Sequence, residues 1–413
     1  AYLHKKGSLH ALAVGGTSRR LVEDIRNFLR VFGPAWLVMI ADVDVASIIE
    51  GLEAGAVWGY RMVFIMLILT LPLFFIQDAA GMLGTVGGLG LGEAIRKRFG
   101  KRTALISSFP MAVTDFLEYV VEYAGMAVGL YMLRLPIVPG LLIIFAAHFM
   151  VIYSRHYRET EAALLPISFI LVAVIAVTVT IFRPDMVSVV KLGLNPIQPY
   201  ENSSFDYMMA ASIGAVIMPW MLFFHSGADS RKKLKMSDLR NERLETLIGA
   251  IVSEVLMAIV VIDGSFIKVE NINNISAIAS ALAIAGNYAR PVLGIGFLAS
   301  GFLALVVVSM GSAWGVVEAM GLKGKGQYYK VYLIESVPAV ALVLLVNNYL
   351  SLILNLMVIY TVVLIPLLIF LGKLIADKRI MNGNAIKKRE VYIFWLMSLG
   401  IAVGGILGLA SII

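Results

Sequence analysis

The sequence predicts an all-α integral membrane protein with about eleven transmembrane helices. Of its 413 residues, 60% are hydrophobic and only 15% are charged, and the mean hydropathy is +0.87. Because soluble domains are about a quarter charged, this composition excludes an ordinary soluble enzyme. A helix crosses the bilayer with about 20 mostly apolar residues. The stretches that meet this requirement are 32–54, 61–83, 107–131, 136–153, 162–182, 207–226, 244–264, 292–317, 330–347, 349–372 and 391–412.

The transmembrane core, residues 32–372, divides into two halves that we expect to be inverted repeats. The first five spans cover about 32–182 and the next five cover about 207–372, and each half contains an odd number of helices. Residues 391–413 add a C-terminal helix. Residues 1–31 form an N-terminal segment, and we expect its charged and apolar stretch, 19–30, to lie on the membrane surface as an amphipathic helix.

The distribution of Lys and Arg predicts the orientation. If the N-terminus is cytoplasmic and the spans alternate, 28 of the 34 basic residues lie in the inside segments. This is a strong positive-inside signal, which places the C-terminus outside a plasma membrane. The first 31 residues contain no apolar region with a cleavage site, so we expect no cleaved signal peptide. The short apolar stretch 275–286 is interpreted as an interfacial or re-entrant piece.

The first span contains acids where a membrane helix should have none. Asp42 and Asp44 lie in mid-span, and Ser47 and Glu50 follow them. A charge at this depth costs several kcal/mol, by an order-of-magnitude estimate, unless it is paired or hydrated. A broken helix with free carbonyls and a carboxylate facing a cavity explains the pattern, and transporters build midplane ion sites in this way.

The sixth span carries a matching interruption. This span contains Gly214-Ala215-Val216-Ile217-Met218-Pro219-Trp220. A proline inside a helix removes a backbone hydrogen bond and frees a carbonyl. The first and sixth spans begin corresponding halves. Paired interruptions at matching places indicate a transporter site.

The third span provides candidates for a proton path. Asp115, Glu118 and Glu122 are spaced i, i+3 and i+7 and therefore share one helical face. His225, at the end of the sixth span, either titrates with them or caps its helix. Further polar candidates for the surroundings of the ion or for its path are Asp42, Glu50, Gln77, Trp220, Asn355 and Tyr360.

Several kinds of chemistry lack their motifs. The chain has no Cys, no HExxH, no Walker A sequence and no GxSxG, so neither an enzyme nor a bound cofactor is expected. The basic loops are interpreted as topology signals, and no nucleic-acid partner is expected. The expected partners are a divalent cation and membrane lipid, and the protein is expected to be a monomer.

Several segments resemble the Nramp divalent-metal transporters. In this family the first broken helix carries an Asp-Pro-Gly-Asn motif and the sixth a Met-Pro-His motif. The matching segments here are Gly33-Pro34, Asp44-Val45-Ala46-Ser47, Glu53-Ala54-Gly55-Ala56, Gly59-Tyr60, Gln77, Leu83-Gly84, Gly92-Glu93, Gly214-Ala215, Met218-Pro219, His225-Ser226 and Ile365-Pro366-Leu367-Leu368. The match covers nearly the whole chain and is specific at the first and sixth helices.

The resemblance implies a LeuT-like fold with broken first and sixth helices. It also implies that the transported ion is surrounded by Asp44, the residue at Ser47, the carbonyl of Ala215 and the sulfur of Met218. Carboxylate and backbone oxygens suit hard divalent cations, whereas a thioether favours softer transition metals.

The sequence departs from the family pattern at the site. Ser47 replaces the motif Asn, and Trp220 replaces the motif His. An acid expected on the third helix falls at Tyr119, although Glu122 is kept, and the paired arginines of the ninth helix have no evident counterpart. With Asp42 as an additional acid, the pattern resembles the Nramp-related magnesium-transporter branch. A roomier, more acidic site suits Mg²⁺, which keeps several of its waters.

These observations predict a secondary transporter of divalent cations that works by alternating access. Mg²⁺ and Mn²⁺ are the expected ions, with weak or no proton coupling. The alternative is a proton-coupled Mn²⁺/Fe²⁺ importer in which Glu118, Glu122 and His225 form the relay. Two further classes are weighed against these: a carrier of organic substrates, whose carboxylates Asp42 and Asp44 would repel, and a passive cation channel, whose uptake would not saturate.

Overall fold

The computed structural model is helical throughout its regular structure, within the residues that it describes. These are residues 22–153, 157–200, 202–267, 280, 286, 288–343, 349–384 and 386–410. The helices, in chain order, are α2 (Pro34–Ala41), α3 (Val45–Trp58), α4 (Arg61–Thr85), α5 (Leu91–Phe99), α6 (Lys101–Met132), α7 (Ile137–Ile152), α8 (Tyr157–Phe182), α9 (Met186–Gly193), α10 (Ser203–Val216), α11 (Pro219–Lys232), η1 (Met236–Asp238), α12 (Leu239–Gly264), α14 (Ala289–Met320), α15 (Lys325–Leu342), α16 (Tyr349–Ile375) and α17 (Lys388–Ala410).

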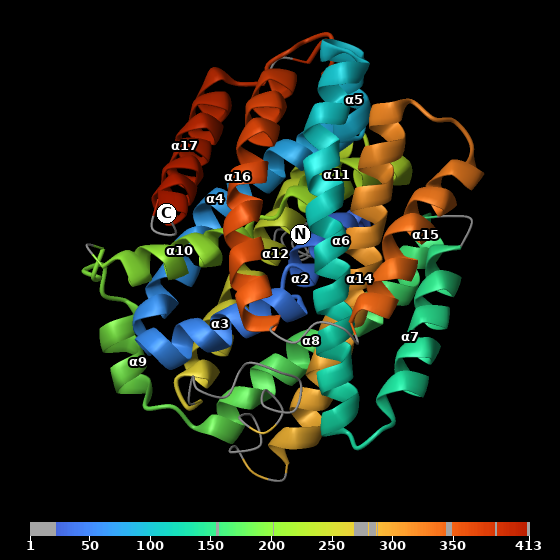
Figure 1. Ribbon diagram of the computed structural model, residues 1–413. Coiled ribbons are helices and arrows are strands. Elements are labelled where there is room, and N and C mark those ends of the chain that lie inside the picture. The colour runs from blue at the N-terminus through green and yellow to red at the C-terminus, as the bar shows by residue number, and fades with distance from the viewer. Residues whose placement is uncertain are drawn as a thin grey trace, which may run out of the picture.

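Each of the eleven predicted spans coincides with a helix or with a broken pair of helices. Among the described residues, eight helices are long and apolar enough to cross a membrane, with α10 and α11 counted as one. The three other predicted spans fall on α2–α3, α7 and α15. The C-terminal helix α17 packs beside α10 and α16 at the edge of the bundle (Figure 1).

Both predicted helix breaks are present, and the local sequence explains where each lies. Asp44 is extended, with φ −83° and ψ 178°, and its carboxylate caps α3 by accepting a hydrogen bond from the backbone N–H of Ser47. Met218 is also extended, with φ −93° and ψ 148°, and Pro219 then occupies the first turn of α11. Proline suits that position, because its missing N–H would have no partner within the helix.

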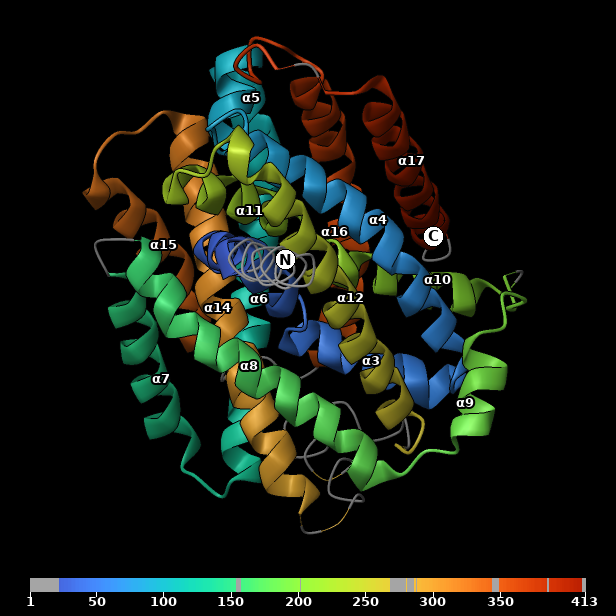
Figure 2. The ribbon, with the colours of Figure 1, turned by 180° about the vertical axis from the view of Figure 1, so that it is seen from behind.

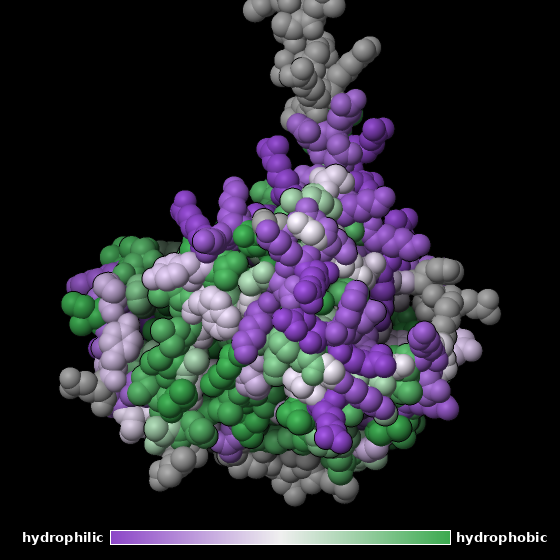
Figure 3. Space-filling view, turned by 90° about the horizontal axis from the view of Figure 1, so that it is seen from above, coloured by the Kyte–Doolittle hydropathy of each residue, from purple (hydrophilic) through white to green (hydrophobic). Residues whose placement is uncertain are grey.

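The segments predicted to face the cytoplasm lie together. Helix α5, the connection from α14 to α15 and the connection from α16 to α17 all lie at the top of Figure 1. Seen from above, hydrophilic residues gather on this face, and hydrophobic residues cover much of the flank (Figure 3). Three of the basic segments predicted to face the cytoplasm therefore share one end of the bundle.

Two helices were not predicted. Leu91–Phe99, which lie between the predicted spans 61–83 and 107–131, form α5, a helix with Leu91 and Ile95 buried and basic residues in its last turn. Helix α9 follows the fifth span. Short helices of this kind give too few turns to stand out against neighbouring apolar spans. Residues 22–31 are helical, in agreement with the expected N-terminal helix; residues 19–21 and most of 275–286 lie outside the described residues.

Helix α12 packs directly against α3, backbone to backbone. A Cβ at Gly55 would lie 1.9 Å from the carbonyl oxygen of Val261, and a Cβ at Gly264 would lie 2.3 Å from that of Leu52. Only glycine permits such an approach, because these neighbours are main-chain atoms that cannot turn aside. Small residues commonly allow helices in membranes to come this close.

This contact predicts that Gly55→Ala destabilises the protein. The added methyl group must push α3 away from α12, and overpacking of this kind costs about 1–3 kcal/mol. Gly400→Ala is the matched control, because a Cβ at this helical position meets nothing within 4 Å. Thermal unfolding of the purified variants should give a lower midpoint for Gly55→Ala alone. Equal midpoints for both variants would contradict the close packing.

Candidate metal-binding site

The two helix breaks meet at the centre of the molecule. The hydroxyl of Ser47, in the first turn of α3, donates a hydrogen bond to the carbonyl oxygen of Ala215 at 3.0 Å. Ala215 belongs to the last turn of α10, where carbonyls lack partners in the same helix. The carbonyl of Val43, in the first break, accepts a hydrogen bond from Ser300 at 2.8 Å. Serine hydroxyls thus satisfy backbone groups that the breaks leave free.

Three carboxylates gather beside this junction. Asp44, Glu118 and Glu122 are fully buried, and each offers an oxygen within 4.8 Å of the others. Glu122 accepts hydrogen bonds from the backbone N–H of Val45 at 3.2 and 3.3 Å, so the third span is anchored directly to the start of α3. None of the described ion pairs includes any of the three carboxylates. Such a group is suited to a divalent cation, because the cation neutralises like charges that otherwise repel.

The acids of the third span continue away from this group through a tyrosine. The hydroxyl of Tyr360, on α16, donates to Glu118 at 3.1 Å and lies 3.4 Å from Asp115. The structure thus brings Asp115 and Glu118 together at Tyr360, and Glu118 and Glu122 together at Asp44. The connected groups form a hydrogen-bonded chain through the interior of the protein.

The sulfur of Met218 is already engaged. The indole N–H of Trp220 donates to it at 3.1 Å, and both side chains are fully buried. The family's motif has a protonatable histidine at position 220. Trp220 instead supplies a neutral N–H, which donates a hydrogen bond to the thioether of Met218. The sulfur of Met218 therefore has one lone pair in a hydrogen bond, whereas Asp44, Glu118 and Glu122 offer carboxylate oxygens beside the breaks.

Asp42 and Glu50 lie among hydroxyls on the other side of the first break. Ser253 approaches Asp42 at 3.4 Å, and Ser212 donates to Glu50 at 2.6 Å. Glu254 of α12, which is not among the predicted site residues, interacts electrostatically with both acids. Among the described residues, neither oxygen of Glu254 has a hydrogen-bond partner. A lone acid in a span without nearby basic residues was the available signal.

Glu335 was also missed by the sequence reasoning. This residue of α15 accepts a hydrogen bond from Tyr119 at 2.8 Å and another from Ser312 at 3.1 Å. A carboxylate therefore lies at the place where the third helix lacks the family's acid, but it comes from a different helix. No local spacing connects α15 with the third span, so the pairing could not be predicted from the sequence.

Two of the predicted polar residues lie elsewhere. Asn355 is exposed and accepts a hydrogen bond from Tyr207 at 3.0 Å, so it does not join the buried carboxylates. Gln77 contacts His225, at 3.1 Å, and His225 lies beside acids of its own rather than beside Glu118 or Glu122. Sequence periodicity does not determine how each helix is rotated about its axis, so it could not predict which neighbours Asn355 and Gln77 contact.

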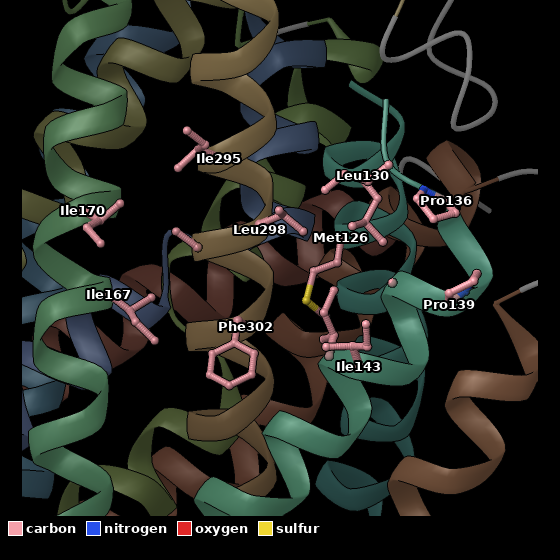
Figure 4. A pocket seen from close by; sticks show the side chains of 14 residues that line it. Met126, Leu130, Pro136, Pro139, Ile143, Ile167, Ile170, Ile295, Leu298 and Phe302 are labelled. Atoms are coloured by element: carbon pink, nitrogen blue, oxygen red, sulfur yellow. The ribbon is translucent and has the colours of Figure 1, made fainter. Parts of the chain in front are cut away.

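A large apolar cavity lies apart from the Asp44, Glu118 and Glu122 carboxylates. It has a volume of about 520 Å³ and lies between α6, α7, α8 and α14 (Figure 4). Its lining includes Met126, Ile143, Ile170, Leu298 and Phe302, without a charged side chain. An ion would lose its hydration there without compensation, so this cavity is unsuited to cations.

The family model of natural resistance-associated macrophage protein-like (Nramp) proteins matches residues 35–411. The chain belongs to the Nramp family. The divalent metal cation transporter MntH of Bacillus subtilis (strain 168) is 26% identical over 396 residues, which cover 91% of each chain. MntH of Clostridium acetobutylicum is 24% identical and covers 70% of each chain. These Nramp relatives are named as transporters and not as enzymes, so the predicted family and protein class are confirmed.

Solved structures agree on the fold. The manganese transporter of Eremococcus coleocola has a TM-score of 0.77 and 22% identity, covering 92% of this chain and 85% of its own. MhsT, in complex with L-phenylalanine, has a TM-score of 0.61 and 10% identity, covering 91% and 98%. Together with the two broken helices, these likenesses confirm the LeuT-like fold. The protein is a multi-pass integral membrane protein.

The junction predicts that Ser47→Ala weakens metal binding. Loss of the hydroxyl removes an oxygen donor and releases the carbonyl of Ala215, and changes of this kind cost about 10–100-fold in metal affinity. Ser108→Ala is the control, because Ser108 is buried in α6 and its hydroxyl has no hydrogen-bond partner among the described residues. Mn²⁺ titration of the purified proteins measures both. An unchanged affinity in Ser47→Ala would exclude Ser47 from the site.

Proposed function

We propose that this protein is a secondary transporter of divalent metal cations that carries Mg²⁺, and also Mn²⁺, by alternating access with weak or no proton coupling. In this proposal Asp44 anchors the ion at the first break. Ser47 supports it directly or through a water molecule, Ala215 supplies its carbonyl from the second break, and Met218 lines the site.

The observation that carries this proposal is the set of donors at the junction. Carboxylate, hydroxyl and carbonyl oxygens surround the breaks, while the sulfur of Met218 accepts the Trp220 N–H. Oxygen ligands suit Mg²⁺ and Mn²⁺, whereas softer ions prefer sulfur. Serine is shorter than the family's asparagine and leaves room for the waters that Mg²⁺ retains. The names of the relatives, which cite manganese or divalent metal cations, agree with the Mn²⁺ part.

A second candidate function has an observation of its own. The chain from Asp44 through Glu118 to Tyr360 and Asp115 connects the ion site to further acids, which is the arrangement that a proton relay needs. It favours the alternative, a proton-coupled Mn²⁺/Fe²⁺ importer. His225 does not contact Glu118, because it lies beside Gln77 and Glu242. Under this alternative it would therefore act separately from the chain.

The membrane arrangement forms part of the proposal. We place the N-terminus and the basic end of the bundle in the cytoplasm and the C-terminus outside a plasma membrane, with the protein as a monomer in contact with lipid. The division into repeats at about 32–182 and 207–372, with 391–413 appended, follows from the same topology. The position of α5 and of the α14–α15 and α16–α17 connections at one end supports this arrangement.

Asp44→Ala should abolish uptake of Mn²⁺ and of Mg²⁺ in proteoliposomes, because no other group at the first break offers a carboxylate that caps α3 and faces the junction. Asp185→Ala is the control. Asp185 is exposed at the start of α9, where hydrogen bonds from Ser188 and Val187 lower the pKa of its carboxyl. If Asp44→Ala transports normally, the site assignment fails.

Competition and acidification separate the two candidate functions. Mn²⁺ uptake is measured with millimolar Mg²⁺ or Ca²⁺ outside and a pH-sensitive dye inside the vesicles. The proposal expects Mg²⁺ to compete and the lumen to keep its pH, because hard oxygen donors do not separate the two ions strongly. Uptake that ignores Mg²⁺ and acidifies the lumen would establish the proton-coupled alternative. Uptake that does not saturate would instead indicate a channel.

A further inference from the structure

A second buried group of metal-ligand side chains lies away from the helix breaks. His225 and Asp229 belong to α11 and Glu242 belongs to α12, and their ligand atoms lie within 4.8 Å of one another. All three side chains are fully buried. Helix α4 packs against both α11 and α12 and closes the group from a third side (Figure 2).

The imidazole of His225 is oriented as a metal ligand would be. Its Nδ1 lies 3.1 Å from Oε1 of Gln77, which fits an Nδ1–H that donates to the amide oxygen. The lone pair of Nε2 then faces Glu242 at 3.2 Å and Asp229 at 3.7 Å. Metal-binding histidines commonly donate their second ring nitrogen to an oxygen in this way.

The group is incomplete as a set of hydrogen bonds. Thr85 donates to Asp229 at 3.0 Å and Thr246 donates to Glu242 at 2.9 Å, so each acid has one satisfied oxygen. Among the described residues, however, Nε2 of His225 and the second oxygens of Asp229 and Glu242 have no hydrogen-bond partner. The oxygens nearest Nε2 are those that Thr85 and Thr246 already contact. Buried polar atoms are nearly always satisfied, so one unpartnered atom on each of three neighbouring side chains indicates a missing ligand.

The basic residues on the same helices do not neutralise these acids. Lys232 donates to Glu161 at 2.5 Å and to the carbonyl of Phe32 at 2.8 Å. Arg243 is paired with Asp78 at 2.8 Å and with Glu390 at 3.1 Å. Neither side chain therefore forms a described ion pair with Asp229 or Glu242, and Lys232 and Arg243 act on these two acids only from farther away.

Glycines on α4 provide the space. A Cβ at Gly81 would lie 2.0 Å from Oε1 of Glu242 and 3.1 Å from Cε1 of His225. A Cβ at Gly84 would lie 2.7 Å from Cβ of Asp229. At Gly81 and Gly84, α4 thus presents only backbone to the group, and the side chains that it contributes there are Gln77, beside His225, and Thr85, beside Asp229.

We propose that His225, Asp229 and Glu242 form a second divalent-cation site, oriented by Gln77, that binds a first-row transition ion such as Mn²⁺. One imidazole with two carboxylates suits such an ion better than Mg²⁺, and water completes its coordination. His225 follows Met218 by seven residues, which is about 10 Å along a helix. The second site therefore lies between the helix breaks and the basic end of α11. It goes beyond the proposed function, since it requires metal binding but no transport.

The test uses Mn²⁺ as the probe and the full chain purified in nanodiscs. An Asp44→Ala background weakens the first site, and electron paramagnetic resonance counts the bound ions. We expect Asp44→Ala to retain one bound Mn²⁺ whose pulsed spectrum shows coupling to an imidazole nitrogen. Adding His225→Gln should remove this coupling and weaken binding at least tenfold. A spectrum of Asp44→Ala without nitrogen coupling, or no bound Mn²⁺, overturns the proposal.

Two further variants protect the result from a folding artefact. His148→Gln is the matched control, because His148 is equally buried but contacts Tyr123, Tyr332 and Ser309 and no carboxylate. The His148→Gln variant should keep the nitrogen coupling, and loss of the coupling in both histidine variants would overturn the site.

Glu242→Gln keeps an oxygen for Thr246 but removes a charge, and in the same background it should weaken Mn²⁺ binding at least tenfold. Unchanged binding in that variant would overturn the site as well. Failure of this site leaves the Asp44 transport experiment unaffected.

Discussion

The hydrogen bond from Ser47 to the carbonyl of Ala215 ties together two helices that are both interrupted inside a membrane protein. An interrupted helix leaves N–H and C=O groups that lipid cannot satisfy, so such breaks persist only where other parts of the protein meet them. Here Ser300 meets the carbonyl of Val43, and Glu122 meets the N–H of Val45. The arrangement of α6, α10 and α14 around the first helix follows from this requirement.

The same interior carries more acid than base. At the breaks, Asp44, Glu118 and Glu122 offer only oxygens, and the sulfurs of Met218 and Met221 accept hydrogen bonds from Trp220 and from the backbone N–H of Met218. Farther along α11, an imidazole joins two carboxylates. Buried negative charge without basic partners is tolerated where cations pass, and the difference in donors gives the two places different preferences among those cations. Under the two proposals, α11 links a hard-oxygen site at the breaks to a mixed nitrogen and oxygen site farther along the helix.

Long apolar runs and mid-span acids sufficed to predict the eleven spans, both breaks and the shared face of the third-span acids. Each of these depends on local sequence, such as Asp44 capping α3 or Pro219 opening α11. The partners that cross between distant helices could not be predicted in this way. Glu335 reaches Tyr119, and Glu254 approaches Asp42, through packing between spans far apart in the chain. The exposure of Asn355 likewise depends on how α16 is rotated, which periodicity leaves open.

Helix α12 holds the two halves of the first broken helix by contacts of unequal strength. It meets α3 through main-chain atoms at Gly55 and Gly264, whereas it holds α2 through Glu245, which accepts hydrogen bonds from Gly33 at 2.7 Å and Trp36 at 2.8 Å. Water can replace a carboxylate at the N–H groups of a helix start, but it cannot replace interlocked backbones. The contact between α12 and α3 is therefore the more rigid of the two, and the contact between α12 and α2 is the one that water could take over.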